Sequence, residues 1–250
     1  MYQPIENEIF HIHTWRCKHA SMDEDYRYIE SAIKLGANRI VFTDHCPFPG
    51  NPFGLRMDIG QLPAYIKTMK ELKKHYVANI EVLVGLEIEY LPSFESFYKE
   101  LYDSKELDLL MLGQHFYEKE NGDWSFHDSD KSEEYIGLCK ALIQGAETGR
   151  FDVIAHPDRS FRNCKEWNSG LMHASYDVAM AAAKNGVILE KNLASMNRTR
   201  QYWPPFWVRT GDAAIMEGYD AHSVAEMEEM WKRKHTFITQ DEINKLLGGC

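Results

Sequence analysis

Short apolar runs recur along the chain and alternate with longer amphipathic stretches. The runs are Glu8–Phe10, Arg39–Phe42, Ile80–Val84, Leu107–Leu112, Phe151–Ala155, Gly186–Leu189 and Ala213–Met216, each of strand length. Such alternation favours parallel strands with right-handed crossovers, and seven or eight units close more readily into a barrel than they lie open. The pattern therefore predicts an α/β fold, a seven-strand β/α barrel, with its site at the C-terminal ends of the strands.

Helix signals fill the intervals between the predicted strands. Capping boxes are expected at Ser21 with Glu24, Ser223 with Glu226 and Thr239 with Glu242, while Gly36, Gly149 and Gly186 are placed to end helices. Two long polar or aromatic loops, Tyr117–Lys131 and Ser195–Thr210, each follow a strand. In a β/α barrel this places both loops on the functional face.

Composition limits the class of protein. The chain has 250 residues, 44% hydrophobic and 26% charged, and no linker or repeat divides it, so we expect one domain over residues 1–250. A net charge of −10 without a basic run argues against a nucleic-acid partner. The five cysteines form no Cys-x-x-Cys pair, and neither a signal peptide nor a membrane-spanning run is found. We expect a cytoplasmic protein with no membrane contact.

Metal-competent side chains gather where the predicted strands end. His11 and His13 alternate along a strand, so both imidazoles can meet one cation. The series continues with His19, His45, Glu87, His115, His156, Asp220 and His222. Any one of these histidines alone is better explained as a hydrogen-bonded core residue. Burying all of them beside two carboxylates would be costly, and bound cations remove that cost.

The ligand types indicate which ions fit. About nine nitrogen and oxygen ligands, at three or four per ion, can hold two or three divalent metals, and Zn, Mn or Fe suits such a set. Cys17 and Cys46 lie inside ligand-bearing segments, but the ligand count is complete without a thiolate. The other histidines are expected at the surface or as caps; they are His75, His127, His173 and His235.

The segments that carry these residues resemble a known family. They are His11-Ile12-His13-Thr14-Trp15-Arg16-Cys17-Lys18-His19, Phe42-Thr43-Asp44-His45-Cys46-Pro47, Gly85-Leu86-Glu87, Gln114-His115-Phe116, Ala155-His156-Pro157 and Asp220-Ala221-His222. Together they look like the motifs of the PHP (polymerase and histidinol phosphatase) family from end to end. The first two segments and Glu190-x-Asn192 are most similar to the histidinol-phosphate phosphatase branch.

The resemblance implies a distorted (β/α)7 barrel of PHP type and a set of metal ligands. One metal would be held by His11, His13, Glu87 and Asp220, a second by His19, His45 and His222, and a third by Glu87, His115 and His156. Glu87 would bridge two ions. Arg159 and Arg198 resemble phosphate-binding arginines, since a planar guanidinium can donate two hydrogen bonds to one phosphate. Weaker candidates for that role are Arg16, Arg56 and Arg200.

The sequence departs from the branch at Asp44, Tyr219, Lys191 and Leu193, which leaves the ligands intact and loosens the choice of substrate. Asp44 either protonates the leaving group or orients a ligand histidine.

The metal-competent residues predict metal-assisted hydrolysis of a small phosphorylated metabolite, and the resemblance implies that this metabolite is L-histidinol phosphate, of histidine biosynthesis. Glu89 or the acids near Asp123 could neutralise its amine. One alternative is a phosphoesterase acting on a nucleotide or another small phosphate ester, and another is a metal-binding barrel without turnover.

Overall fold

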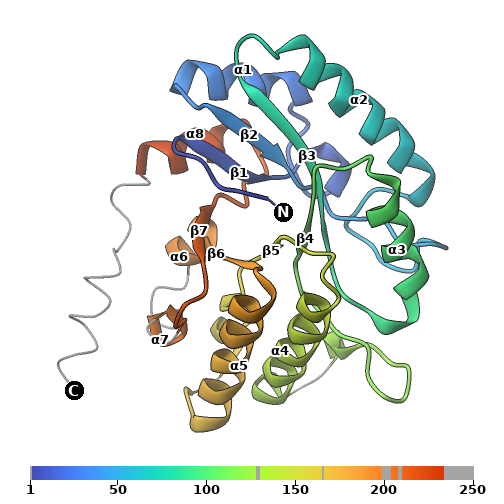
Figure 1. Ribbon diagram of the computed structural model, residues 1–250, viewed down its shortest axis with the longest axis vertical. Helices are drawn as coiled ribbons and strands as arrows, with labels where there is room; N and C mark the ends of the chain where they lie inside the picture. The colour runs from blue at the N-terminus through green and yellow to red at the C-terminus, as the bar shows by residue number, and fades with distance from the viewer. Residues whose placement is uncertain (1, 128–129, 165, 199–203, 208–209, 234–250) are drawn as a thin grey trace. The chain divides into compact units, whose positions relative to one another are not determined.

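The computed structural model describes residues 2–127, 130–164, 166–198, 204–207 and 210–233 (Figure 1). Its strands are β1 (Glu8–Ile12), β2 (Arg39–Phe42), β3 (Glu81–Ile88), β4 (Leu109–Leu112), β5 (Val153–Ile154), β6 (Ile188–Asn192) and β7 (Ile215–Gly218). Its helices are α1 (Asp25–Leu35), α2 (Leu62–His75), α3 (Glu95–Ser104), α4 (Lys131–Glu147), α5 (Ser169–Asn185), α6 (Leu193–Arg198), α7 (Pro204–Trp207) and α8 (Val224–Arg233). Short 3₁₀ turns are η1 (Trp15–Cys17), η2 (Ile59–Gln61), η3 (Pro92–Phe94), η4 (Ser125–His127) and η5 (Arg159–Asn163).

The described residues fall into two compact units. The first is drawn from Met1–Ile88, Phe94–Met111 and Glu217–Lys234, and the second from Glu89–Ser93 and Leu112–Met216. The prediction of a single domain over residues 1–250 is not decided by this division and stays a prediction.

The first unit holds a parallel ladder. Glu8 of β1 pairs with Arg39 of β2, which pairs in turn with Glu81 of β3. The N–H of Asp108 donates to the carbonyl of Val84 at the entry to β4, and the N–H of Tyr219, just after β7, donates to the carbonyl of Phe10 in β1. The strand that is last in sequence therefore pairs with the first.

The second unit continues the same order. The N–H of Ala155 donates to the carbonyl of Leu112, β5 pairs with β6 in parallel, and the N–H of Leu189 donates to the carbonyl of Ala214. The seven strands thus form one sheet in the order β1 to β7. This is the order of the predicted seven-strand β/α barrel, and that prediction is confirmed.

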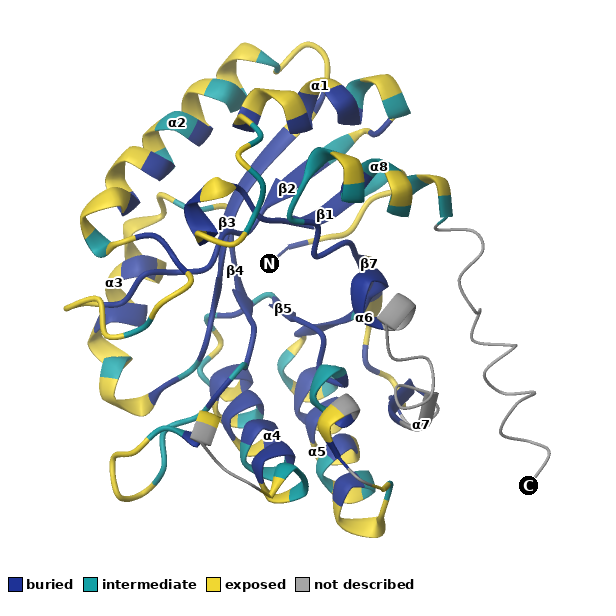
Figure 2. Ribbon diagram, turned by 180° about the vertical axis from the view of Figure 1, so that it is seen from behind, coloured by how far each residue is buried: buried dark blue, intermediate teal, exposed yellow. Residues whose placement is uncertain are grey.

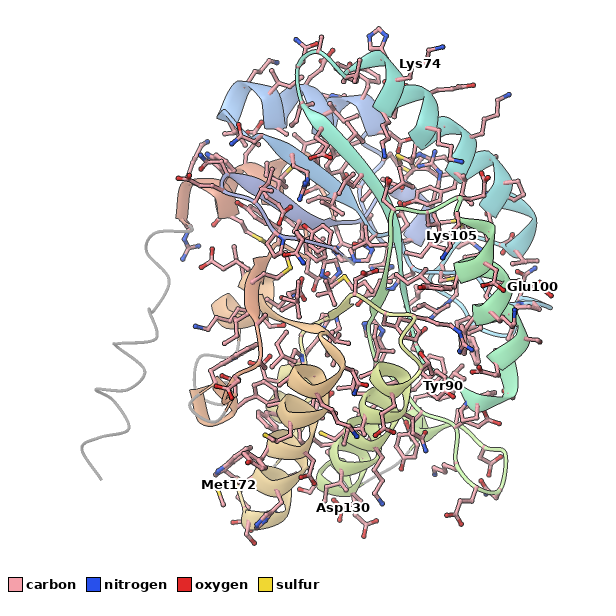
Figure 3. The ribbon with its side chains drawn as sticks, viewed as in Figure 1. Lys74, Tyr90, Glu100, Lys105, Asp130 and Met172 are labelled. Atoms are coloured by element: carbon pink, nitrogen blue, oxygen red, sulfur yellow. The ribbon has the colours of Figure 1, made fainter. Side chains whose placement is uncertain are left out.

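The helices expose one side and bury the other, as amphipathic segments do (Figure 2). In α2, Tyr65 and Met69 are buried while Lys74 is exposed (Figure 3). The Tyr65 hydroxyl donates to the carbonyl of Gly85 in β3, so this helix is tied to the sheet by a buried hydrogen bond. In the second unit, α4 packs on α5 and the hydroxyls of Tyr135 and Ser175 lie 3.1 Å apart. No helix in the described ranges is both long and apolar enough to cross a membrane.

Several predicted boundaries need correction. β1 and β3 run further than expected, so His11 and Glu87 lie inside strands. β6 begins only at Ile188, because Gly186 is the left-handed cap that ends α5. β7 likewise begins later than predicted, at Ile215. The predicted loop Ser195–Thr210 contains most of α6 and all of α7.

The helix signals were partly right. Gly36 caps α1 as predicted, and Gly149 follows the end of α4 with a φ of 68°. The Ser21 box is wrong: α1 begins at Asp25, and the Ser21 hydroxyl donates to Asp23 instead. Ser223 does cap α8, since its hydroxyl oxygen accepts the N–H of Glu226. The Thr239–Glu242 box lies outside the described residues.

Gly85 provides a test of the packing between β3 and β4. A Cβ at this position would lie 2.8 Å from the Leu109 side chain and 2.9 Å from the Leu109 carbonyl oxygen. Gly85→Ala is therefore expected to lower the free energy of unfolding by about 1–3 kcal/mol, because neither strand can move apart without losing its ladder. Urea denaturation measures this. Gly60→Ala, where a Cβ would meet nothing within 4 Å, is the control and should change stability by less than about 0.5 kcal/mol.

Candidate metal centre

A bulge in β1 brings His11 and His13 together. Ile9 pairs with Ile40 and Ile12 with Phe42, so β1 has one more residue than β2 between these pairs. His11, at the bulge, has a φ of 70°, in the left-handed region. Both histidines are fully buried, and their Nε2 atoms lie 2.8 Å apart. The two imidazoles therefore meet, as predicted, although an irregular strand rather than simple alternation places them.

Two buried carboxylates face this pair. Asp220 Oδ1 lies 3.4 Å from His13 Nε2 and 3.7 Å from His11 Nε2, and Glu87 Oε2 lies 3.5 Å and 3.6 Å from the same two atoms. Ligand atoms at 2.0–2.1 Å from a tetrahedral Zn²⁺ are separated by about 3.3 Å. The nitrogen and oxygen atoms are therefore spaced as ligands around one ion would be. We call these four residues the first cluster.

Three further histidines adjoin the first cluster. His45 Nδ1 lies 3.0 Å from Glu87 Oε2, and the ring of His222 stacks on that of His13 at a centroid distance of 4.3 Å. His19 Nε2 and His222 Nε2 are 2.8 Å apart. His13, His45 and His222 each offer an atom that could bind one shared ion.

The orientation of two of these rings is set by backbone carbonyls. His19 Nδ1 lies 2.7 Å from the carbonyl oxygen of Cys17, and His222 Nδ1 lies 3.1 Å from that of Asp220. A carbonyl only accepts, so each Nδ1 carries the proton and each Nε2 keeps its lone pair. The two lone pairs are directed to the same place, which suits a shared cation.

Burial keeps the imidazoles neutral. Burial, followed by the charge of His45, lowers the pKa of His13 to about 3. Burial, followed by the charge of His13, lowers the pKa of His222 to about 3. Neutral imidazoles are the form that binds metal, and the adjacent carboxylates of Glu87 and Asp220 are oxygen ligands that a cation also accepts. The donor set therefore fits divalent metal.

The second unit holds a smaller group of the same kind. The rings of His115 and His156 have centroids 5.1 Å apart, and the buried Glu89 carboxylate lies 3.0 Å from His115 Nδ1. The N–H of His156 donates to Glu190 Oε2 at 2.9 Å, and the φ of His156 is 31°. Assignment of a third ion to Glu87, His115 and His156 stays a prediction.

These carboxylates are residues whose role the sequence analysis missed. Glu89 was considered as a countercharge for the substrate amine, but it holds the His115 ring. Glu190 entered only through the family resemblance, and Glu226 only as a helix cap; Glu226 Oε2 accepts the N–H of His222 at 2.8 Å. Carboxylates commonly orient metal-binding histidines, so a glutamate two residues after a predicted ligand was the available signal for Glu89.

Asp44 is fully buried, and its carboxylate accepts hydrogen bonds from neighbouring residues. Its oxygens accept from the N–H and hydroxyl of Thr14 and from the thiol of Cys17. Burial raises the pKa of Asp44 to about 6 and that of the Cys17 thiol well above its usual value. These contacts favour the orienting role for Asp44 over leaving-group protonation.

The arginines differ in how they are placed. Arg159 is half-buried and its N–H donates to the carbonyl of His156, which fixes the segment between them. Arg198 belongs to α6, but its side chain lies outside what the structure describes, as does Arg200. Arg16 forms two hydrogen bonds with Asp25, and Arg56 donates to the Cys46 carbonyl, so both stabilise the fold.

The remaining predicted positions, where they are described, make other contacts. The thiol of Cys46 donates to the Pro47 carbonyl. His75 is exposed at the end of α2, and His173 lies in α5 with its Nδ1 2.7 Å from the Ser169 carbonyl. His127 ends η4 with its side chain not described, and His235 lies outside the described residues. Asp123 is exposed in the turn after β4.

The chain is similar to proteins that are already described. The chain is 29% identical over 236 residues to the "Probable histidinol-phosphatase" of Deinococcus radiodurans, covering 87% of this chain and 86% of the relative. It is 32% identical over 141 residues to the histidinol-phosphatase of Bacillus subtilis, covering 53% of each. The solved histidinol phosphate phosphatase of Lactococcus lactis, complexed with Zn, L-histidinol and phosphate, has the same fold. That comparison has a TM-score of 0.71 at 17% identity and covers 93% of this chain and 95% of the other.

The family comparison extends over most of the sequence. The PHP domain model matches residues 10–194, about three quarters of the chain, and the matched range begins just before His11 and includes His156. With its seven strands and its clustered histidines, the chain belongs to the PHP domain family.

Proposed function

We propose that this protein hydrolyses phosphate monoesters and that L-histidinol phosphate is its substrate. The observation that carries the proposal is the first cluster, in which two buried imidazoles and two buried carboxylates have the spacing of metal ligands. Relatives named as histidinol-phosphatases, one of them solved with Zn, L-histidinol and phosphate, support the choice of substrate.

Divalent metal is the cofactor. We propose that the protein binds two to three ions and that these are Zn, Mn or Fe. Such ions lower the pKa of water and neutralise phosphate oxygens. The residues proposed as ligands are His11, His13, His19, His45, Glu87, His115, His156, Asp220 and His222.

The other proposed residues act on the substrate or on the ligands. Arg159 and Arg198 bind the non-bridging phosphate oxygens, where positioned cations stabilise developing charge. Asp44 holds the segment that carries His13. The protein is proposed to work in the cytoplasm as one domain.

Removal of a ligand tests the metal assignment. The purified protein should contain two to three equivalents of transition metal, and His11→Ala, Glu87→Ala and Asp220→Ala should each lower both metal content and hydrolysis of p-nitrophenyl phosphate. Glu87→Ala should be the most severe, because loss of a bridging carboxylate exposes two cations to mutual repulsion. Elemental analysis measures the content. The exposed His75→Ala is the control, and full occupancy in all three variants would reject the assignment.

Arg159→Ala tests phosphate recognition. A charged hydrogen bond contributes about 1.5–3 kcal/mol, so kcat/KM should fall by about 10- to 150-fold, by a similar factor for every phosphomonoester. Metal content should stay at the wild-type level. Arg27→Ala, on the exposed side of α1, is the matched control and should leave kcat/KM unchanged. A loss confined to one substrate would show that Arg159 contacts the leaving group instead.

The substrate itself is tested by comparing kcat/KM values. L-Histidinol phosphate should exceed glycerol phosphate, sugar phosphates and nucleotides, because only part of the binding energy comes from the phosphate that all of them share. Equal values for histidinol phosphate and glycerol phosphate would leave a general phosphatase. A higher value for a nucleotide would favour the nucleotide phosphoesterase alternative. No turnover by the metal-loaded protein would favour a metal-binding barrel without activity.

A further inference from the structure

Cys17 touches three of the proposed ligand residues at once. Its Sγ lies 3.2 Å from His13 Nδ1 and accepts the backbone N–H of His45 at 3.3 Å. Its carbonyl oxygen lies 2.7 Å from His19 Nδ1. The residue is fully buried, and it ends the 3₁₀ turn η1, which places its side chain and its carbonyl between β1 and the segment after β2.

The hydrogen bonds around the sulfur have a defined direction. His13 Nε2 faces Glu87 and Asp220, so as a metal ligand it keeps its lone pair and the proton resides on Nδ1. That Nδ1–H donates to Cys17 Sγ, and the thiol proton is donated to Asp44 Oδ1 at 3.1 Å. These hydrogen bonds link the imidazole to the thiol and the thiol to the carboxylate. Most metal-binding histidines instead contact a carboxylate or carbonyl directly.

The far end of this chain is held rigidly. Asp44 also accepts from the N–H and hydroxyl of Thr14, and the Thr14 hydroxyl accepts from Arg16. Arg16 is in turn fixed by two 2.7 Å hydrogen bonds to Asp25 at the start of α1. A sulfur that is ordered on every side can hold the ring of His13 and the backbone of His45 in one geometry.

We propose that Cys17 is a positioning residue that sets the tautomer and orientation of the metal-binding histidines, and that it is not itself a metal ligand. The proposal rests on the metal assignment made under the proposed function. It would also account for a cysteine beside His13 and Asp44 in a group that could otherwise be taken for a thiolate metal site.

The test is the affinity for Zn²⁺, measured by competition with a chromophoric chelator. Cys17→Ala should weaken the Kd by about 10- to 100-fold, the usual cost of losing a residue that orients a ligand, while the number of ions bound at saturation stays the same. Cys17→Ser can still donate and accept, so its Kd should lie between those of Cys17→Ala and the wild type. Co²⁺-substituted wild-type protein should show no thiolate-to-cobalt charge-transfer band.

The control is Cys139→Ala, which removes a thiol that is equally buried in α4 and belongs to none of the ligand groups described. Its Kd should equal that of the wild type. This holds even if Cys17→Ala and Cys139→Ala lower the thermal unfolding temperature of the chelator-treated protein by the same amount. Should Cys17→Ala not fold, Cys17→Ser carries the comparison. A Kd for Cys17→Ala within twofold of the wild-type value, or a cobalt band that Cys17→Ser abolishes, would overturn the proposal. Absence of phosphatase activity would contradict the proposed function, whereas the Zn²⁺ affinities would still test the role of Cys17.

Discussion

Two carboxylates buried among uncharged imidazoles are the constraint on which the first unit depends. Glu87 is 1% exposed and Asp220 6% exposed, so neither carboxylate is well hydrated, and burial lowers the pKa of the nearby His13 and His222. An ionised carboxylate removed from water costs several kcal/mol unless a positive charge accompanies it. His13 and His222, whose pKa values are lowered by burial, do not supply that charge. Divalent cations are the partner that this chemistry calls for, and metal would then stabilise the fold as well as react.

The backbone has an uncommon conformation at several of the proposed metal ligands. Among the described residues other than glycine, the positive φ angles include those of His11, His156 and Asp220, all proposed ligands. Such conformations are uncommon and persist only where the surroundings hold them. In β1 the bulge produces the turn at His11, and the pairing of Ile12 with Ala221 holds the segment of Asp220 beside it. Strand pairing thus offsets local strain at the residues whose direction matters most.

A second layer of residues restrains the proposed ligands. Cys17 serves His13 and His45, Glu226 serves His222, and in the second unit Glu89 and Glu190 serve His115 and His156. Each of these partners is an acceptor that fixes a ring or a backbone N–H, which leaves lone pairs directed at the proposed ions. The thiol is the exception in type, since it both accepts and donates.

The sequence by itself determined the fold and the family and proposed the ligands, because apolar periodicity and residue identity are local properties. It located each of the seven strands, although only β2 has the predicted boundaries, and it marked His11 to His222 as candidates. The tertiary structure alone decided the partners. His115 meets Glu89 across 26 residues, Asp44 meets Cys17 across 27 and His156 meets Glu190 across 34. Such contacts depend on strand register and on a bulge at His11, and a difference of one residue in register turns every side chain to the other face of the sheet. No local pattern encodes that register, which is why Cys17 could be seen in the sequence while its role could not.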